Sequence, residues 1–390
     1  MKLKKRKNKF QFKRKLVVIS TLILLMVLGV GYSFLSENLS IQGNINLKSK
    51  SISTAALLDT GININNKMKE ITSSGEINDS IYSIKRSNSI PDKYVNNNYL
   101  VSSTESTIPI YLWYEDNTIY FYSQAKTILL NKDSSYMFSK LYNLENIETN
   151  EFDTREVINM SSMFEYSGYD TENLNLDLKE WDVSKVEDMS YMFDTVGNNS
   201  KSIDLDLSNW NVENVKDMSS MFEYTGNTSL TVNLNLNNWN TTNVENMSRM
   251  FYCSGRFASE YSLDINNLNT ENVKDMSYMF YSFESSLNDF NLDLTKFNTS
   301  NVINMKEMFN LSGENSTSYK LNISNWDMSQ VIDLENIFKD AGINSKEWQI
   351  IIPKTNNNEL FNTNNILYGK EKEVIYTLEN KEFTIKDSQE

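Results

Sequence analysis

The residues that could do chemistry in this chain are acidic and recur at a fixed spacing. The chain contains a 29-residue repeat in which two positions are mostly polar from copy to copy. We call the residues at one position of successive copies a column, and the acidic members of these two columns include Asp177, Asp204, Asp206, Asp264 and Asp293. On parallel strands, like charges in a column lie about 4.8 Å apart and repel, so they favour a divalent cation or a basic ligand. The alternative is a solvated polar face with asparagine ladders, which is the commoner role of such residues. We predict an exposed binding face at these five residues, with no resident metal ion.

Acid pairs such as Asp204 and Asp206 also resemble a glycosidase pair. Glycosidases need two carboxyl groups in unlike environments, whereas every repeat here offers similar acids. The chain has no His and a single cysteine, Cys253, which excludes His-based triads, His metal sites and an intrachain disulfide. Other repeats carry Tyr, Thr, Ser or Leu at the place of Cys253, which indicates a packing residue rather than a reactive thiol. We therefore expect no enzyme activity and no cofactor.

These acids must be positioned by a repeat that is built around a Met-Phe pair. The pair recurs with a constant 29-residue step, at Met163-Phe164, Met192-Phe193, Met221-Phe222, Met250-Phe251, Met279-Phe280 and Met308-Phe309, and in altered form at Ile337-Phe338. Each pair follows a Val by six positions and another Met or Leu by three. A fixed period of this length is typical of a solenoid, in which each unit buries its apolar face against its neighbours.

Two periodicities share each repeat. Strict alternation, as at Ile203, Leu205 and Leu207, predicts a strand with one buried face. The following pattern Val-x-x-Met-x-x-Met-Phe has the spacing of a short amphipathic helix, with Asn214 as an N-cap and Asp217 three positions later. The predicted fold is therefore an α/β repeat solenoid: an irregular, leucine-rich-repeat-like array of 29-residue strand–helix units with a parallel sheet, capped at both ends.

Charge is segregated along the chain. The first 35 residues hold nine Lys or Arg and no acid, which leaves 28 basic and 51 acidic residues, or −23, in the rest. An acidic body argues against nucleic-acid binding, which needs a basic face for phosphate.

Residues 16–35 are uncharged and mostly apolar, long enough to cross a bilayer as a helix. The basic cluster before them predicts a cytoplasmic N-terminus and places residues 36–390 outside. The segment is either a retained signal-anchor, which we favour, or a signal peptide cut after a small residue such as Gly31 or Ser33.

The sequence divides into six segments. They are a basic segment 1–15, the membrane segment 16–35, a stalk or small N-terminal region 36–98, an N-terminal cap 99–140, the repeats 141–342, and a C-terminal cap and tail 343–390. A helix is expected through Asn65–Thr72 and a hairpin around Glu115-Asp116-Asn117.

The repeat motif resembles that of a known family. The run Trp-Asn-Val-x-x-Val-x-Asp-Met-Ser-x-Met-Phe, from Trp210 to Phe222, is similar to the repeat of BspA-like leucine-rich-repeat surface proteins, also known as the mycoplasma lipoprotein repeat. The resemblance covers about residues 100–342. It implies an exported, surface-displayed protein, and some members of the family are described as adhesins. The chain lacks a lipobox Cys, so lipoprotein anchoring does not carry over.

These observations favour an interaction protein. We expect a bacterial cell-surface protein, membrane-anchored or secreted, that binds an unidentified protein or cell-surface polymer through its acidic repetitive face. One alternative is a structural envelope protein that self-associates. A glycan-active enzyme is the least favoured alternative.

Overall fold

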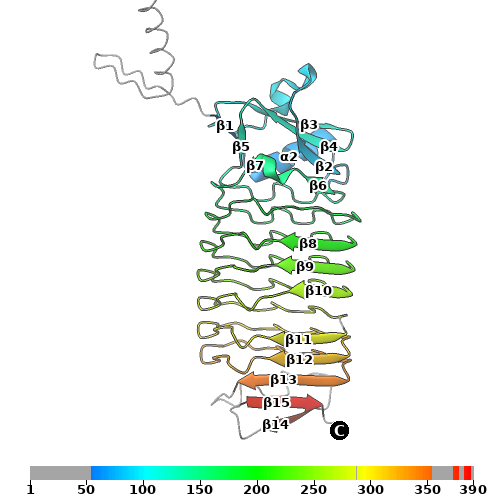
Figure 1. Cartoon of the computed structure of the whole chain (residues 1–390), viewed down its shortest axis with the longest axis vertical. Helices are drawn as coiled ribbons and strands as arrows, with labels where there is room; N and C mark the ends of the chain where they lie inside the picture. The colour runs from blue at the N-terminus through cyan, green and yellow to red at the C-terminus, as the bar shows by residue number, and fades with distance from the viewer. Residues whose placement is uncertain (1–53, 287, 354–371, 377–381, 388–390) are drawn as a thin grey trace, which may run out of the picture. The chain divides into compact units, whose positions relative to one another are not determined.

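The computed structural model describes residues 54–286, 288–353, 372–376 and 382–387 (Figure 1). The basic segment, the membrane segment 16–35 and the first part of the predicted stalk lie outside these residues. In the part of the chain that is described, no helix has both the length and the apolar character needed to cross a membrane.

The chain from Ala55 to Asp153 forms the N-terminal cap of the repeats. Strands β3 (Ile110–Glu115) and β4 (Thr118–Ser123) are antiparallel, and β2 (Ser83–Arg86) lies parallel to both β4 and β6 (Asn146–Ile147). Asp116 and Asn117 join β3 to β4 with φ of 49° and 58°, which suits a two-residue hairpin turn and confirms the predicted hairpin.

Helix α2 (Gly61–Thr72) contains the predicted helix and begins four residues earlier. The helix was predicted from the spacing of Met68 and Ile71, and Met68 is fully buried while Ile71 is partly buried against the same core as Ile64. Three 3₁₀ turns, Asp92–Tyr94, Asn97–Tyr99 and Thr149–Glu151, complete this region. A second small sheet, with β5 (Thr127–Leu129) between β1 (Ala55–Leu57) and β7 (Phe152–Asp153), is parallel throughout.

From Ile203 onward the alternating segments of the repeats are strands, as predicted, whereas the predicted strand through Leu174, Leu176 and Leu178 is absent and only Asn175 forms a bridge, to Asn146. Strands β8 (Ser202–Asp206), β9 (Thr231–Asn235) and β10 (Glu260–Leu263) form one sheet in which Ile203, Val232 and Tyr261 are neighbours, so the register follows the repeat period (Figure 1). The other sheet of the repeats begins with the parallel strands β11 (Asp289–Asp293), β12 (Ser318–Asn322) and β13 (Glu347–Pro353). It continues with β15 (Glu382–Asp387), which is antiparallel to both β13 and β14 (Lys372–Tyr376).

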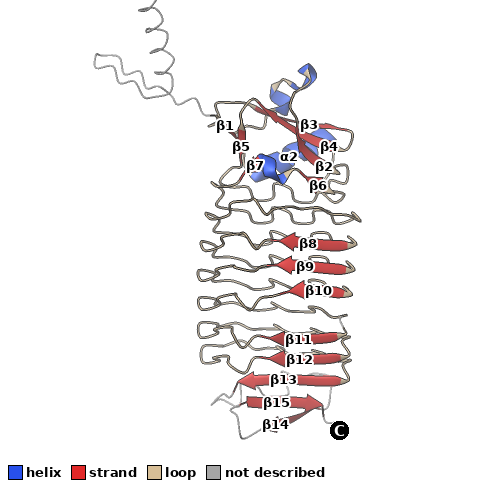
Figure 2. Cartoon of the chain, viewed as in Figure 1, coloured by secondary structure: helices blue, strands red, loops and turns tan. Residues whose placement is uncertain are grey.

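The prediction of a helix in each repeat is wrong. Among the described residues the one α-helix is α2, which precedes the repeats, and the Met-Phe segments are runs of turns (Figure 2). The residue before each Met-Phe pair has a left-handed backbone, with φ of 56° at Ser220 and 58° at Arg249. A left-handed residue interrupts a right-handed helix. The fold is therefore a stack of strand-and-turn coils rather than an α/β strand–helix solenoid.

Hydrogen bonding between coils explains why turns replace the helix. Alternate N–H groups donate to the next coil, as from Arg249 N to Ser277 O (2.9 Å) and from Phe251 N to Met279 O (3.0 Å). The intervening N–H groups close local turns, as from Met250 N to Met247 O (3.3 Å). The backbone donors of the segment are thus paired without a helix. Asp217, predicted to lie in a helix cap, instead accepts from Ser219 N (2.8 Å) in an Asx turn.

Stacked aromatic rings form the core of the coils. The Phe residues of consecutive Met-Phe pairs stack with ring centroids 5.4 to 5.8 Å apart, and all are buried; the column is Phe138, Phe164, Phe193, Phe222, Phe251, Phe280, Phe309 and Phe338. The buried Trp residues fasten their coils to earlier ones, because Trp239 Nε1 donates to Leu207 O (2.9 Å) and Trp210 Nε1 to Leu178 O (3.0 Å). Both columns were predicted to be core, and both are.

Candidate binding face

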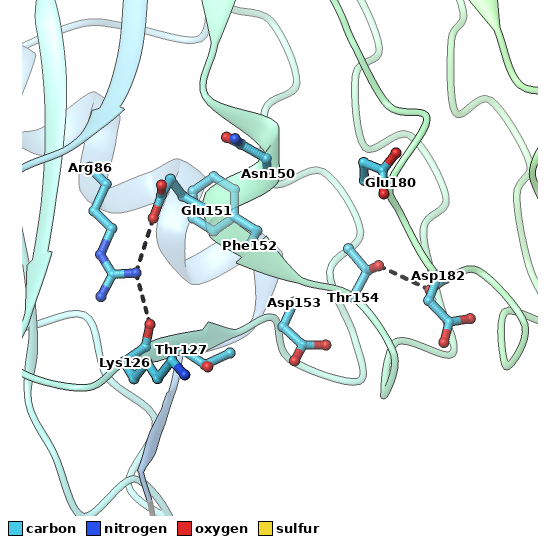
Figure 3. A pocket seen from close by; sticks show the side chains of 10 residues that line it. All are labelled: Arg86, Lys126, Thr127, Asn150, Glu151, Phe152, Asp153, Thr154, Glu180 and Asp182. Carbon is cyan, nitrogen blue, oxygen red and sulfur yellow. Dashed lines mark hydrogen bonds and ion pairs between the residues drawn. The ribbon is translucent and has the colours of Figure 1, made fainter.

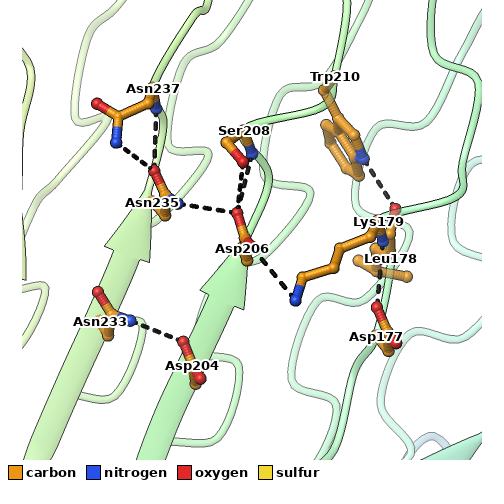
Figure 4. A network of polar contacts seen from close by, with 10 residues as sticks. All are labelled: Asp177, Leu178, Lys179, Asp204, Asp206, Ser208, Trp210, Asn233, Asn235 and Asn237. Carbon is orange, nitrogen blue, oxygen red and sulfur yellow. Dashed lines mark hydrogen bonds and ion pairs between the residues drawn. The ribbon is translucent and has the colours of Figure 1, made fainter.

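The outward side chains of β8 to β12, with the polar residue that ends or follows each strand, form a surface that we call the strand face. Asp204 and Asp206 point outward from β8, beside Asn233 and Asn235 of β9 (Figure 4). The amides of β9 donate across the sheet, from Asn233 Nδ2 to Asp204 Oδ1 (2.8 Å) and from Asn235 Nδ2 to Asp206 Oδ1 (2.9 Å). These cross-strand bonds fix the orientation of the outward side chains.

Four of the five predicted site residues share one column and one structural role. The Oδ1 atom of each accepts the backbone N–H two positions later in an Asx turn. The pairs are Asp177 with Lys179 (3.3 Å), Asp206 with Ser208 (3.3 Å), Asp264 with Asn266 (3.0 Å) and Asp293 with Thr295 (2.9 Å). These carboxylates therefore shape the turn that leaves each strand, while Asp204 makes no such bond and stays exposed.

The turns also keep two of these acids ionised. The hydroxyl of Ser208, its backbone N–H and the ammonium of Lys179, 3.3 Å from Asp206 Oδ2, lower the pKa of Asp206. The backbone N–H and side-chain amide of Asn266 lower the pKa of Asp264. Carboxylates with lowered pKa values suit electrostatic recognition of a basic ligand rather than general-acid chemistry.

The structure brings only some of the five residues together. Asp204 and Asp206 share β8, and Asp177 lies one coil before them. Asp264 follows β10 and Asp293 ends β11, on two strands that belong to different sheets. The predicted site is therefore an extended display of similar acids over several coils, interrupted by Asn233 and Asn235 of β9, not a pocket. Within the described residues, no group of three or more Cys, Asp or Glu side chains is placed to hold a metal ion.

A polar pocket lies where the N-terminal cap meets the first coils (Figure 3). Arg86 crosses it, donating from Nη1 to Glu151 Oε2 (3.0 Å) and to Lys126 O (3.1 Å). Asp153 and Asp182 line the other side. Sequence reasoning missed this pocket because its residues come from distant segments with no shared motif. The guanidinium of Arg86 is already paired, so we assign it a fastening role between cap and repeats.

A charge cluster with buried Asp194 and Glu223 lies on the turn side of the coils and was also missed. Glu165, Asp194 and Glu223 occupy one column in consecutive repeats, directly after each Met-Phe pair. Burial and the neighbouring Glu223 and Glu165 raise the pKa of Asp194 to about 7, against the lowering effect of the Thr195 hydroxyl. Arg249 pairs with Glu223 through two nitrogens and lies 4.0 Å over the Tyr252 ring. An acid directly after consecutive Met-Phe pairs was the available sequence signal.

The single cysteine is a packing residue in the described structure. Cys253 is 1% exposed, and burial raises the pKa of its thiol to about 11. Thiol chemistry proceeds through the thiolate, so Cys253 is unreactive at neutral pH.

Coils of one length, each hydrogen-bonded to the next, define a repeat protein. The chain belongs to the family described as "Mycoplasma protein of unknown function, DUF285", whose profile matches residues 132–260 and 224–350 and so spans more than half of the 390 residues. A search of the curated proteins and a search of the solved structures found no match.

Proposed function

We propose that this chain is a bacterial surface protein, similar to the BspA-like repeat proteins, that binds a protein or a cell-surface polymer through the strand face. The observation that carries the proposal is the repetition of outward acids and amides on consecutive parallel strands, held by bonds such as Asn233 to Asp204. Family membership is compatible with surface display. Display would depend on residues 16–35, with residues 36–390 outside the cell.

The strand face favours a ligand that is basic and extended. Its exposed acids include Asp204 and Asp289, and its exposed neutral residues are amides or hydroxyls such as Asn233, Asn291 and Ser262. Such a surface offers hydrogen bonds at each strand and negative charge on β8, β10 and β11, whereas β9 carries amides and β12 carries Lys320, so weak contacts add along the stack. A ligand with repeated amino or guanidinium groups matches this spacing.

Adding positive charge to the strand face tests the binding proposal. The full chain carrying Asp204→Lys, Asn233→Lys and Asn291→Lys should lose about tenfold or more of its binding to intact cells and to isolated envelope polymer. A control with Glu213→Lys, Asn214→Lys and Glu271→Lys alters exposed side chains away from the strands and should bind as the parent does. Equal binding by the two variants would contradict the proposal. Concentration-dependent oligomers of the parent, without any other ligand, would favour the self-associating alternative.

Surface display is tested separately. External protease applied to native cells should remove the body of the protein from the membrane fraction and leave Met1 intact at the N-terminus. A mature N-terminus near Tyr32 or Phe34 in the medium would instead mean that the protein is released. Protection of the whole chain from external protease would rule out display.

A further inference from the structure

The repeat stack opens on one side between β10 and β11. The 29-residue step would place Tyr261 beside Phe290, as it places Val232 beside Tyr261. Both strands are described, yet they belong to different sheets (Figure 1). On the turn side the ladder continues without a break, since Phe251 N bonds to Met279 O (3.0 Å) and Phe280 N to Met308 O (2.9 Å). The coils are therefore joined along the Met-Phe segments and separated along their strands.

Two changes in the repeat, at Glu284 and Phe297, coincide with the opening. Glu284 replaces the Gly that stands at this position in other repeats, with φ of 47°. At Gly255, an added Cβ would lie 2.1 Å from the Tyr261 ring, so this column has no room for a side chain. In other repeats the backbone N–H of the Gly at this position donates to the preceding coil, as from Gly255 N to Thr225 O (3.1 Å) and from Gly313 N to Phe283 O (3.0 Å). Among the described residues, Glu284 N makes no corresponding bond to Ser254 O.

The tryptophan column changes at the same place. Trp210, Trp239 and Trp326 each donate an indole N–H to an earlier coil. Leu268 and Phe297 replace Trp in the coils that contain β10 and β11, and neither side chain has a donor. With the offset of the Trp239 and Trp326 bonds, Phe297 removes a fastener between the coils of β11 and β10, at the opening, whereas Leu268 removes one between the coils of β10 and β9, which remain paired.

The opening leaves strand groups without the partners that they have elsewhere. Tyr261, Leu263 and Leu292 are only partly buried, whereas the corresponding Val232, Leu234 and Leu321 are at most 2% exposed. Among the described strands, none pairs with the facing backbone edges of β10 and β11, and a free strand edge is a template for another strand. The outward residues at this edge include Glu260, Asp264, Asp289 and Asp293, so the margin is acidic.

We propose that the opening between β10 and β11 is a peptide-binding site that accepts one extended strand from a partner protein. The added strand pairs with the free edges through its backbone, as in other cases of β-strand addition. Its apolar side chains face Tyr261, Leu263 and Leu292, and alternate Lys or Arg side chains face the acidic margin. Insertion requires the strands to separate by about 4.8 Å beyond normal sheet spacing, with the turn side as the hinge. This proposal does not rest on ligand binding by the strand face, although its acidic margin includes Asp264 and Asp293 of that face.

Hydrogen exchange on the full chain tests this inference. The probe is a synthetic peptide copying residues 229–237 with Asn233→Lys and Asn235→Lys. In the free protein, amides of β10 and β11 should exchange at least about tenfold faster than those of β8 and β9, and the peptide should slow them by about the same factor. Amides of β12 are the internal control and should not change. A peptide that also carries Leu234→Pro cannot complete the ladder and should give no protection.

The variant Glu284→Gly restores the glycine column and should close the opening. We expect slow exchange in β10 and β11 without the peptide, and loss of the peptide effect. The inference is overturned if β10 and β11 are already protected in the free parent, if the peptide protects nothing, or if Glu284→Gly still responds to it. The strand-face proposal is judged separately, by the binding of the Lys variants on β8, β9 and β11 to cells and to envelope polymer.

Discussion

At the scale of single residues, the acids of this chain have three different fates. Asp206 and Asp264 shape turns and remain ionised, Asp204 is exposed, and Asp194 is buried with a raised pKa. The sequence indicated the exposed columns because their alternation with buried Leu and Val is strict. It could not indicate the Asx turns of the first column, since an Asp at a strand end fits a turn, a ligand site or a solvated face equally well.

The protonation of Asp194 should make stability depend on pH. Its folded pKa of about 7 lies above the usual value of about 4, so the folded state binds more protons between these values. The stabilising effect is complete below about pH 4 and is lost as pH rises through about 7. Urea unfolding should therefore show lower stability at about pH 8 than at about pH 5.

The variant Asp194→Asn provides the matched comparison, because the amide keeps the shape without the charge. It should abolish most of the decrease between about pH 5 and about pH 8, whereas the exposed-site control Glu213→Gln should retain it. A parent protein whose stability is the same at both pH values would contradict the assignment.

At the scale of elements, the strands were predictable and the Met-Phe segments were not. The pattern Val-x-x-Met-x-x-Met-Phe predicts buried apolar residues, and Val215, Met218, Met221 and Phe222 are fully buried. A run of turns with left-handed residues at Ser220 and Tyr224 buries the same apolar residues that a helix would bury. The difference lies in the backbone bonds between coils, which no apolar periodicity records. The recurring Asp-Met-Ser, an Asx-turn sequence, was the signal that favoured turns.

The indole bond of Trp239 allows a test of how coils are fastened. Trp239→Phe keeps an aromatic ring in the 2%-exposed site but removes the N–H that donates to Leu207 O. Because Trp210 N also donates to Leu207 O, the carbonyl keeps one partner. We expect a loss of about 1 kcal/mol in the free energy of unfolding, seen as a lower urea midpoint. An unchanged midpoint would mean that the bond contributes nothing to stability.

At the scale of the whole molecule, the repeat period was readable and the way the coils join was not. The constant step between Met-Phe pairs predicted stacked units with parallel strands, and β8 to β10 have that register. The interruption after β10 coincides with Glu284 and Phe297, whose effect is visible only once the coil geometry is known. The cap pocket at Arg86 and Glu151 joins residues 65 positions apart and carries no local pattern. Its position therefore required the folded structure.

The most direct test of the coil architecture uses one position in a Met-Phe segment. Glu307 precedes Met308-Phe309 with φ of 52°, a conformation in which Gly is favoured over Ala because Gly has no Cβ. Urea unfolding of Glu307→Gly and Glu307→Ala compares two variants that lose the same contact to Asn310. We predict that the Gly variant is more stable by about 1 kcal/mol. In a helix the order reverses by about 1 kcal/mol, so a more stable Ala variant would contradict the stack of strand-and-turn coils.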